Sequence, residues 1–435
     1  MSDTTHDSRT LRAFAPALAL LFICLVINYI DRGNLSIAAP LLKRELDLSP
    51  SQLGILFAAF FATYTAMQFV IGWLVDRFEA NTILAAGFLL WSLATTTTGL
   101  VRGFAILLTM RLILGIGESV ALPASSKILC RHLPEHHRGF ASGALMSALR
   151  CGNAVGTFSA GYLMATYGWR PVFIWVGLVS ILWLPAWWKW KPRNGRVASH
   201  SEQAHRGVTN SDSDCSDAAS PGVIDILCQR SFWGTSIGHF SCNYLFYFMI
   251  TWLPSYLVLE RHLSLTTMTT IAGMYYSVDA ASAIGGGWLQ DVAIRRGHSA
   301  TVVRKSAMAI GFAVAAVAII ACAIAGPKTY ALWLMAAGVG CGLTGPGLFT
   351  FPQTLAGPKA VGKWYGSQNG FANTAGVIGP ALTGLVVQRT GNFLLPFVLV
   401  SALCVVGALA FVFVVKRVEP VRWAENRDPA LVTVA

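Results

Sequence analysis

Six ionisable side chains stand inside long apolar stretches of this sequence, where charge is costly. They are Asp31, Arg32, Arg111, Glu118, Arg150 and Asp279. An ionisable group near the middle of a bilayer costs about 2.5–3.5 kcal/mol on insertion scales, so each of these side chains should face the interior of a helical bundle. Carboxyl groups in such a place can carry protons, and guanidinium groups can hold anions. The alternative for each residue is an internal ion pair that only joins helices.

Asp31 and Arg32 are neighbours in the sequence. On a helix their side chains diverge by about 100°, so they cannot serve one identical partner. Arg32 offers planar, bidentate donors that never deprotonate, which suits a bound carboxylate. We therefore expect these two residues to have different roles.

Arg111 and Glu118 are seven residues apart, which places them on one helix face about 10 Å apart along the axis. A carboxyl group at membrane depth gains or loses its proton according to which cation lies close, as a proton carrier requires. The alternative is a permanent bridge from Arg111 to Glu118 or to Asp31. For Arg111 itself, we favour this structural role over substrate contact.

Arg150 and Asp279 are the two remaining buried charges. Arg150 adds to the positive charge in the interior of the amino-terminal half, which attracts an anion more strongly when the nearby acids are protonated. Asp279 could pair with Arg150, screen a substrate amine or bind a second cation. We assign Arg150 to substrate binding and Asp279, with Asp31, Glu118 and Arg111, to proton coupling.

Uncharged polar residues accompany these charges. They can hydrogen-bond substrate hydroxyls, and the alternative is glue between helices, worth about 0.6 kcal/mol per bond. For His239 we favour helix packing. The candidates for substrate binding are Tyr29, Tyr64, Asn243, Tyr244, Gln353, Gln368, Asn369 and Asn373.

The composition identifies the elements that must hold these residues. The chain has 435 residues, 54% hydrophobic and 12% charged, whereas soluble domains carry about 25% charged residues. Hydropathy predicts an all-α integral membrane protein with twelve transmembrane helices. They are expected near residues 13–39, 51–75, 82–101, 104–128, 140–166, 171–190, 232–258, 267–290, 306–325, 329–352, 362–388 and 392–415.

The polar stretch after the sixth helix divides the chain. We predict an amino-terminal six-helix bundle over 1–190, a cytoplasmic linker over 191–229, a carboxyl-terminal bundle over 230–417 and a cytoplasmic tail over 418–435. Most Lys and Arg residues outside the apolar segments lie on the side of both termini, which makes that side cytoplasmic. The net charge of +12 therefore indicates contact with anionic lipid, not nucleic acid.

An internal repeat links the two halves. The segment Gly72-Trp73-Leu74-Val75-Asp76 recurs as Gly287-Trp288-Leu289-Gln290-Asp291, and the same offset pairs Asp279 with Tyr64. Two parallel six-helix repeats are typical of major facilitator transporters. Asp76, Arg77 and Asp291 stand at equivalent helix ends, where a carboxylate can lie against a helix amino terminus. We predict that they close a gate at the cytoplasmic face.

Several motifs resemble one family within this superfamily, the anion:cation symporters, over both halves of the chain. In that family the position of Arg32 resembles a carboxylate clamp, and Asp31 matches an acidic position linked to proton binding. The residues Phe78-Glu79-Ala80-Asn81 depart from the superfamily pattern. The segment Gly72-x-x-x-Asp76-Arg77 instead resembles the superfamily's signature between the second and third helices. The motifs that resemble the symporter family are Tyr29-Ile-Asp31-Arg32-Gly-Asn34-Leu, Arg111-x-x-x-Gly115-x-Gly117-Glu118, Asn243-Tyr244 before Thr251-Trp252-Leu253-Pro254, and Gln368-Asn369-Gly-x-x-Asn373.

The resemblance implies a proton-coupled symporter that imports an organic anion, foremost a sugar acid, by alternating access in the inner membrane. A drug or metabolite antiporter and a dicarboxylate carrier are the alternatives. An enzyme is disfavoured because no catalytic constellation is present. The nine cysteines form no CxxC motif, so we expect no metal, and no cofactor beyond H⁺ or, alternatively, Na⁺. The expected partners are the substrate and the lipid bilayer, and the chain is expected to be a monomer.

Overall fold

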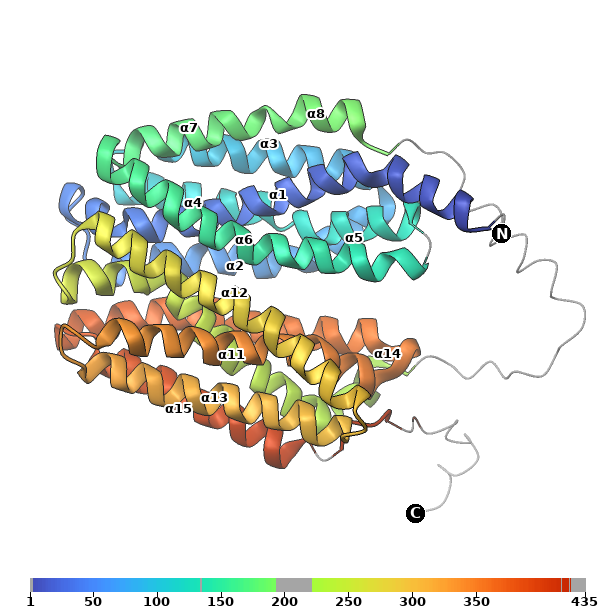
Figure 1. Cartoon of the computed structure of the whole chain (residues 1–435). Helices are drawn as coiled ribbons and strands as arrows, with labels where there is room; N and C mark the ends of the chain where they lie inside the picture. Colours follow the sequence, from blue (N-terminus) through green and yellow to red (C-terminus); the bar gives the residue numbers. More distant parts are fainter. Residues whose placement is uncertain (1–2, 134, 193–220, 416, 422, 424–435) are drawn as a thin grey trace, which may run out of the picture.

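The computed structural model describes residues 3–133, 135–192, 221–415, 417–421 and 423. The described residues are almost entirely helical (Figure 1). Those of the amino-terminal half form α1 (Asp3–Glu45), α2 (Pro50–Arg77), α3 (Ala80–Thr98), α4 (Phe104–Glu118), α5 (Ala121–His132), α6 (Glu135–Tyr167), α7 (Trp169–Ile181) and α8 (Trp183–Trp190). Those of the carboxyl-terminal half form α10 (Val223–Leu227), α11 (Arg230–Ser255), α12 (Leu265–Arg295), α13 (Ala300–Ile324), α14 (Tyr330–Thr390) and α15 (Leu394–Leu409). Single π-helical turns at Tyr256–Glu260 and Ala410–Val414 extend α11 and α15.

These elements make twelve membrane-crossing helices in the described part of the chain, as the sequence predicts. Eight crossings are long and apolar by composition alone, and α2, α3, α6 and α12 complete the set. Two predicted crossings are built from two helices each, α4 with α5 and α7 with α8. In the opposite sense, α14 contains two crossings, because Gly357 has a φ of 67° and interrupts the helical backbone. Only glycine adopts this conformation without strain.

Local sequence explains where several helices begin. The Ser49 hydroxyl accepts from the Gln52 amide at 3.2 Å, and Gln52 Oε1 accepts from the Ser49 amide at 2.8 Å. This capping box, with Pro50 in the first turn, starts α2. The interruption between α4 and α5 is followed by Pro123, which lacks the N–H that a continuous helix would need. Glu118 therefore stands at the last residue of a helix.

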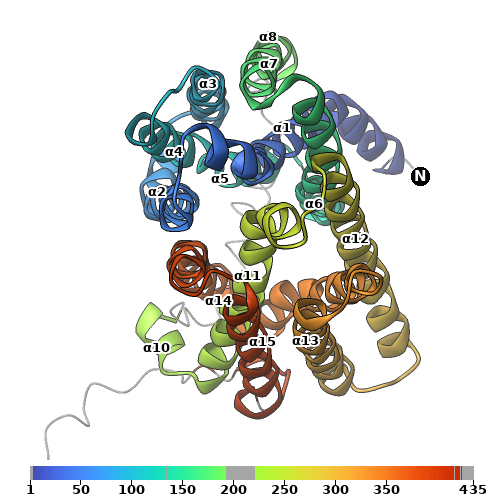
Figure 2. The ribbon, with the colours of Figure 1, turned by 90° about the vertical axis from the view of Figure 1, so that its left-hand side faces the viewer.

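The two halves lie side by side as two bundles (Figure 2). We call the end where α2 finishes at Arg77 and α12 at Arg295 the terminal end, because α1 begins there (Figure 1). The opposite end, where α1 finishes at Glu45, is the far end. Contacts between the halves pair α2 with α14, α6 with α12, and α1 with α11.

Several contacts close the halves against each other toward the far end. The Ser51 amide donates to Gln388 Oε1 at 3.1 Å. A Cβ on Gly54 would lie 2.7 Å from the Pro380 carbonyl oxygen, so α2 and α14 can approach this closely only with glycine there. The Phe57 and Trp252 rings meet edge to face at 5.5 Å. The far end is thus tightly packed between the halves.

The predicted linker and tail fall largely outside the described residues. Of the segment 191–229, residues 193–220 lie outside them, and Val223–Leu227 form the short helix α10. At the start of the tail, the Val418 amide donates to Thr301 Oγ1 at 3.1 Å. The Val421 amide donates to the Leu355 carbonyl at 2.8 Å. These bonds hold residues 418–421 against α13 and α14.

Candidate functional site: a central cavity with two ion pairs

A cavity of about 450 Å³ lies between the two halves. Each helix around it contributes one face, as on α11, where the lining residues follow the helical spacing of three and four. Leu, Met and Phe side chains complete the wall. The lining residues with polar atoms or sulfur are Tyr29 and Arg32 on α1, Tyr64 and Gln68 on α2, Ser126 on α5, Arg150 and Asn153 on α6, His239, Cys242, Asn243 and Tyr247 on α11, and Cys341, Tyr365, Asn369 and Asn373 on α14.

Arg32 stands in an aromatic box on the cavity wall. Its guanidinium carbon lies 4.6 Å from the centre of the Tyr29 ring and 4.4 Å from that of Tyr64. The Phe60 ring closes a third side at 5.2 Å. Arg32 Nε donates to Glu118 Oε2 at 2.9 Å. This bond uses one of the five N–H groups of the guanidinium, so Arg32 can hold Glu118 while it also faces the cavity.

The partner of Glu118 is therefore Arg32, not Arg111. The bridges from Arg111 to Glu118 or Asp31 that the sequence left open are not formed, since no ion pair among the described residues includes Arg111 or Asp31. The Arg111 guanidinium lies 4.9 Å from the centre of the Phe60 ring, on α2. Both Arg111 and Asp31 are buried, and neither lines the cavity.

Asp31 points away from Arg32, as the helical divergence predicts. Its Oδ1 accepts from Asn34 Nδ2 at 3.3 Å, and the residue is 1% exposed. A second carboxyl group thus lies inside the amino-terminal half, behind the one that holds Arg32. The two acids could bind protons separately.

The second ion pair joins the two halves. Arg150 Nη1 on α6 donates to Asp279 Oδ2 on α12. This pairing is one of the three roles that the sequence left open for Asp279. Arg150 lines the cavity, whereas Asp279 lies behind it and does not. A charged contact between helices of different halves therefore borders the cavity.

Amides and a phenol line the carboxyl-terminal wall. The Tyr247 hydroxyl donates to Asn373 Oδ1 at 2.5 Å, and Asn373 Nδ2 donates to the Asn369 carbonyl at 2.9 Å. Asn243 lies about one helical turn before Tyr247 on the same face of α11, and it also lines the cavity. This wall carries no charge and offers both donors and acceptors.

Comparison with known proteins places the chain in a family. The model of the Major Facilitator Superfamily matches residues 21–303 and 297–433. The chain belongs to the Major Facilitator Superfamily. The "Probable sulfoacetate transporter" of Cupriavidus necator is 31% identical, over 91% of this chain and 93% of that protein. The "Hexuronate transporter" of Bacillus subtilis is 30% identical, over 93% of this chain and 95% of that protein.

Solved structures agree on the fold of this facilitator. A bacterial homologue of the human lysosomal transporter Spinster superposes with a TM-score of 0.74 at 19% identity, over 92% of this chain and 96% of that one. The D-xylose-proton symporter gives 0.75 at 13% identity, over 93% and 98%. The resemblance to the anion:cation symporters is supported by the sequence relatives. This facilitator is a membrane transporter and not an enzyme.

Three expected substrate residues of this facilitator lie elsewhere. Tyr244 is one residue from Asn243 and so points about 100° away, toward Gly379 on α14. Gln368 is fully buried and its Nε2 contacts His239 Nδ1 at 3.1 Å. Gln353 is exposed near the break at Gly357. None of the three lines the cavity.

Several cavity residues were not singled out from the sequence. Asn153 is 4% exposed and lines the wall, one turn from Arg150. Tyr247 is one turn from Asn243, and Tyr365 is one turn from Asn369. Spacing of three or four residues from a recognised site residue is the signal that finds all three. His239, expected to serve helix packing, both packs on Gln368 and lines the cavity.

The predicted gate residues stand at the terminal end. Arg77 is exposed, and its guanidinium carbon lies 5.6 Å from the centre of the Trp73 ring of its own helix. Asp291 is exposed on α12. The side chain of Asp76 lies outside the described residues. The gate remains a prediction.

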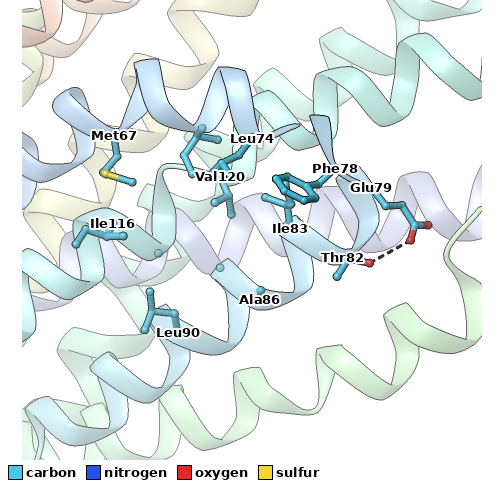
Figure 3. Close-up of a pocket in the computed structure, with 13 residues that line it drawn as sticks. Met67, Leu74, Phe78, Glu79, Thr82, Ile83, Ala86, Leu90, Ile116 and Val120 are labelled. Atoms are coloured by element: carbon cyan, nitrogen blue, oxygen red, sulfur yellow. Dashed lines mark hydrogen bonds between the residues drawn. The ribbon is translucent and has the colours of Figure 1, made fainter. Parts of the chain in front are cut away.

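A second cavity, of about 570 Å³, has no such set of guanidinium, phenol and amide groups (Figure 3). It lies among α2, α3 and α4 and is lined almost entirely by apolar side chains, such as Met67 and Leu90. Its acid, Glu79, lies in the loop before α3, where hydrogen bonds from Asn81 and Thr82 lower the pKa of Glu79. Because charge is confined to its rim, this cavity is a poor place to hold an anion.

No group of three or more His, Cys, Asp or Glu that could hold a metal ion occurs within the described ranges. The side chains that line the central cavity offer guanidinium groups, phenols and amides, and a buried carboxyl group is paired with each of the two guanidinium groups. The site can hold an anion and exchange protons.

Proposed function

We propose that this facilitator is a proton-coupled symporter that imports an organic anion, foremost a sugar acid. The observation that carries the proposal is Arg32 on the cavity wall, paired with the buried Glu118. Relatives named for hexuronate, for galactarate and D-glucarate, and for D-galactonate support the choice of substrate class. The charge-free carboxyl-terminal wall suits the hydroxyl groups of such acids.

Glu118 and the substrate carboxylate compete for one cation in this proposal. The Arg32 and Glu118 side chains are 5% and 0% exposed, so their charges interact with little screening by water. While Glu118 is ionised, it neutralises Arg32. When Glu118 is protonated, the Arg32 guanidinium loses its counter-ion and attracts the substrate carboxylate. Binding of the anion and of the proton then favour each other.

Asp31 provides a second protonation site, and Arg111 sets the field around both acids. Asp31 lies next to Arg32 in the sequence but turns into the bundle. A proton on Asp31 neutralises the negative charge that would otherwise accompany the empty carrier. Arg111, held over Phe60, keeps the interior positive after both acids are protonated. Asp279 adds a third carboxyl group near the cavity.

Substrate hydroxyls are recognised by neutral groups around the clamp. Tyr29 and Tyr64 flank Arg32, and Asn243, Asn369 and Asn373 face them from the other half. Each can donate or accept a hydrogen bond. A polyhydroxylated acid would thus span the cavity from the charged wall to the amide wall, which links both halves.

Transport occurs by alternating access, with the terminal end on the cytoplasmic side of the inner membrane. The far-end contacts described above correspond to a carrier closed on the outside, and Asp76, Arg77 and Asp291 would close the other end in turn. The basic residues at the terminal end support this orientation. One chain supplies every group of the cavity, so we propose that it works as a monomer.

Uptake into proteoliposomes tests the proposal. Purified protein is reconstituted, a proton gradient is imposed, and accumulation of labelled glucuronate and of glucarate is measured. We expect accumulation above the outside concentration that collapses with a protonophore and does not need Na⁺. Accumulation driven by Na⁺ alone, or no uptake of any acid by folded protein, would contradict the proposal.

A second candidate, a carrier of dicarboxylates, is favoured by one observation. Arg150 brings a second guanidinium group to the cavity that Arg32 lines. A substrate with two acid groups could bind both guanidinium groups, whereas with a substrate that has one acid group Arg150 would stay paired with Asp279.

A further inference from the structure

The Arg150–Asp279 pair differs from a buried structural bridge in the exposure of its members. The Arg150 side chain is 28% exposed and the Asp279 side chain 4%. Arg150 therefore offers the cavity the N–H groups that Asp279 does not occupy. Asp279 holds Arg150 from behind, where water has little access.

The Arg150 guanidinium also rests on α14. A Cβ on Gly345 would lie 2.6 Å from Arg150 Nη2, so the absence of a side chain at this position lets the guanidinium lie across the helix. Asp279 and Gly345 belong to the carboxyl-terminal half, and Arg150 belongs to the amino-terminal half. The head of Arg150 is thus seated in the half to which it does not belong.

The two cavity arginines are spaced for one small molecule. Gly152 on α6 packs against Val26 and Tyr29 on α1, and both helices run from the terminal end to the far end. Arg150 lies before this contact and Arg32 beyond it. With 1.5 Å of rise per residue, the two Cα atoms are offset by roughly 10 Å along the bundle. Long arginine side chains can close on two acidic groups across this offset.

We propose that Arg150 is a specificity-determining residue that holds a second acidic group of the substrate, and that Asp279 occupies this place in the empty carrier. The preferred substrate is then a dianion with acidic groups at both ends of a short hydroxylated chain. This inference rests on the proposed function, because it assigns the first acidic group to Arg32. Asp279 competes with the substrate for the Arg150 guanidinium, so the second acidic group of the substrate must displace it.

If Asp279 competes with the substrate for Arg150, loss of Asp279 and loss of Arg150 should change the affinity for a dianion in opposite directions. Removing Asp279 frees Arg150 and should tighten binding of a dianion while it leaves a monoanion nearly unchanged. Removing Arg150 and Asp279 together should abolish the advantage of the dianion. A bridge that serves only structure would instead change the binding of both kinds of acid to the same extent.

The test uses two probes that differ by one carboxylate, a hexarate with acid groups at both ends and the hexonate of the same configuration. Binding to purified full-length protein is measured by calorimetry for wild type, Asp279→Asn, and the double variant Arg150→Gln/Asp279→Asn. The double variant keeps a polar side chain at both positions, with Asn isosteric to Asp279 and Gln shorter than Arg150, and it leaves no unpaired buried charge. Gly366→Ala, at an exposed α14 position with open space around it, is the matched control and should bind like wild type.

We expect the wild type to bind the hexarate about tenfold more tightly than the hexonate, corresponding to one well-placed charged contact. Asp279→Asn should bind the hexarate several-fold more tightly still, and the double variant should bind both acids equally. Equal affinities in wild type, or an unchanged ratio in the double variant, would overturn this proposal and leave the proposed function standing. Failure of wild type to bind either acid would overturn both.

Discussion

Two arginine–carboxylate pairs border the cavity, and they are alike in chemistry and different in location. Arg32 and Glu118 both belong to the amino-terminal half and are sealed, at 5% and 0% side-chain exposure. Arg150 and Asp279 belong to opposite halves, and the arginine is 28% exposed. The first pair can open and close without any movement between the halves. The second pair is broken or strained whenever the halves move apart at that level.

This difference separates two tasks of a coupled carrier. A pair inside one rigid bundle is suited to link a proton to an anion, because only charge has to change. A pair between two bundles is suited to report on the position of the bundles and on what lies between them. Variants that break one pair at a time show whether the molecule divides its work in this way.

The largest effect is expected at Arg32. Arg32→Lys keeps the charge but loses the planar fork, and Arg32→Ala leaves Glu118 buried without a partner. Truncating one member of a buried charge pair typically costs 2–5 kcal/mol, so carboxylate affinity should fall by about 100-fold or more. Calorimetry or the substrate-induced thermal shift measures the carboxylate affinity of each variant.

Arg170→Lys provides the matched control for the clamp. Arg170 pairs with Glu45 at 2.8 Å, but Glu45 is exposed and Arg170 only half-buried, and such surface pairs are worth about 0–1 kcal/mol. The affinity of Arg170→Lys for the carboxylate substrate should stay near that of wild type. Near-normal affinity in both Arg32 variants would refute the clamp.

The pair between the halves should matter for stability and for conformation. Arg150→Gln leaves Asp279 buried and unpaired and should destabilise the protein by about 3 kcal/mol or more, most of which Asp279→Asn in the same chain should restore. Spin labels on the two halves should report a changed distance distribution in the double variant. The corresponding Arg32→Gln/Glu118→Gln variant should leave that distribution unchanged, and a change there would erase the contrast between the pairs.

A smaller effect is expected when the seat of Arg150 is disturbed without removing charge. The Cβ of Gly345→Ala would lie 2.6 Å from Arg150 Nη2, so the end of this flexible side chain must move aside. The affinity for a dianion should fall by about threefold, or roughly 0.7 kcal/mol, while the affinity for a monoanion is unchanged. Equal losses for the two acids would mean that Gly345 serves helix packing alone.

A similarly small effect is expected at the predicted gate. Asp76→Asn should shift the population toward the state open at the terminal end and leave substrate binding intact, because the residue is far from the cavity. A helix-end carboxylate is worth about 0.3–1 kcal/mol, so the shift is at most about fivefold. Unchanged label distances across the terminal end in Asp76→Asn would refute the gate.

Hydropathy and charge alone could predict the twelve helices and the six ionisable residues that face the interior of the bundles. These features depend on the cost of placing polar groups in lipid, which each stretch of sequence reveals by itself. The sequence also predicted that Asp31 and Arg32 face different partners, since their 100° divergence is a property of one helix. Its internal repeat indicated two alike halves before any contact was known.

Partners on different helices could not be predicted in the same way. The choice of Arg32 over Arg111 for Glu118 depends on how α1 and α4 are rotated and shifted against each other, which neither helix encodes alone. The seven-residue spacing of Arg111 and Glu118 suggested a shared face, but α4 ends at Glu118 and the carboxylate turns to α1. Tyr244 and Gln353 were misplaced because polarity does not reveal which face of a buried helix meets the cavity.

The most direct test of the account compares two transport assays on Glu118→Gln in proteoliposomes. Glutamine imitates the protonated carboxyl group and cannot release a proton, so Arg32 stays available to the anion. We expect this variant to bind substrate and to exchange labelled for unlabelled acid across the membrane, while accumulation driven by a proton gradient is lost. If Glu118→Gln concentrates substrate with the same dependence on the pH gradient as wild type, the Arg32–Glu118 pair does not couple protons to transport, and the central claim is wrong.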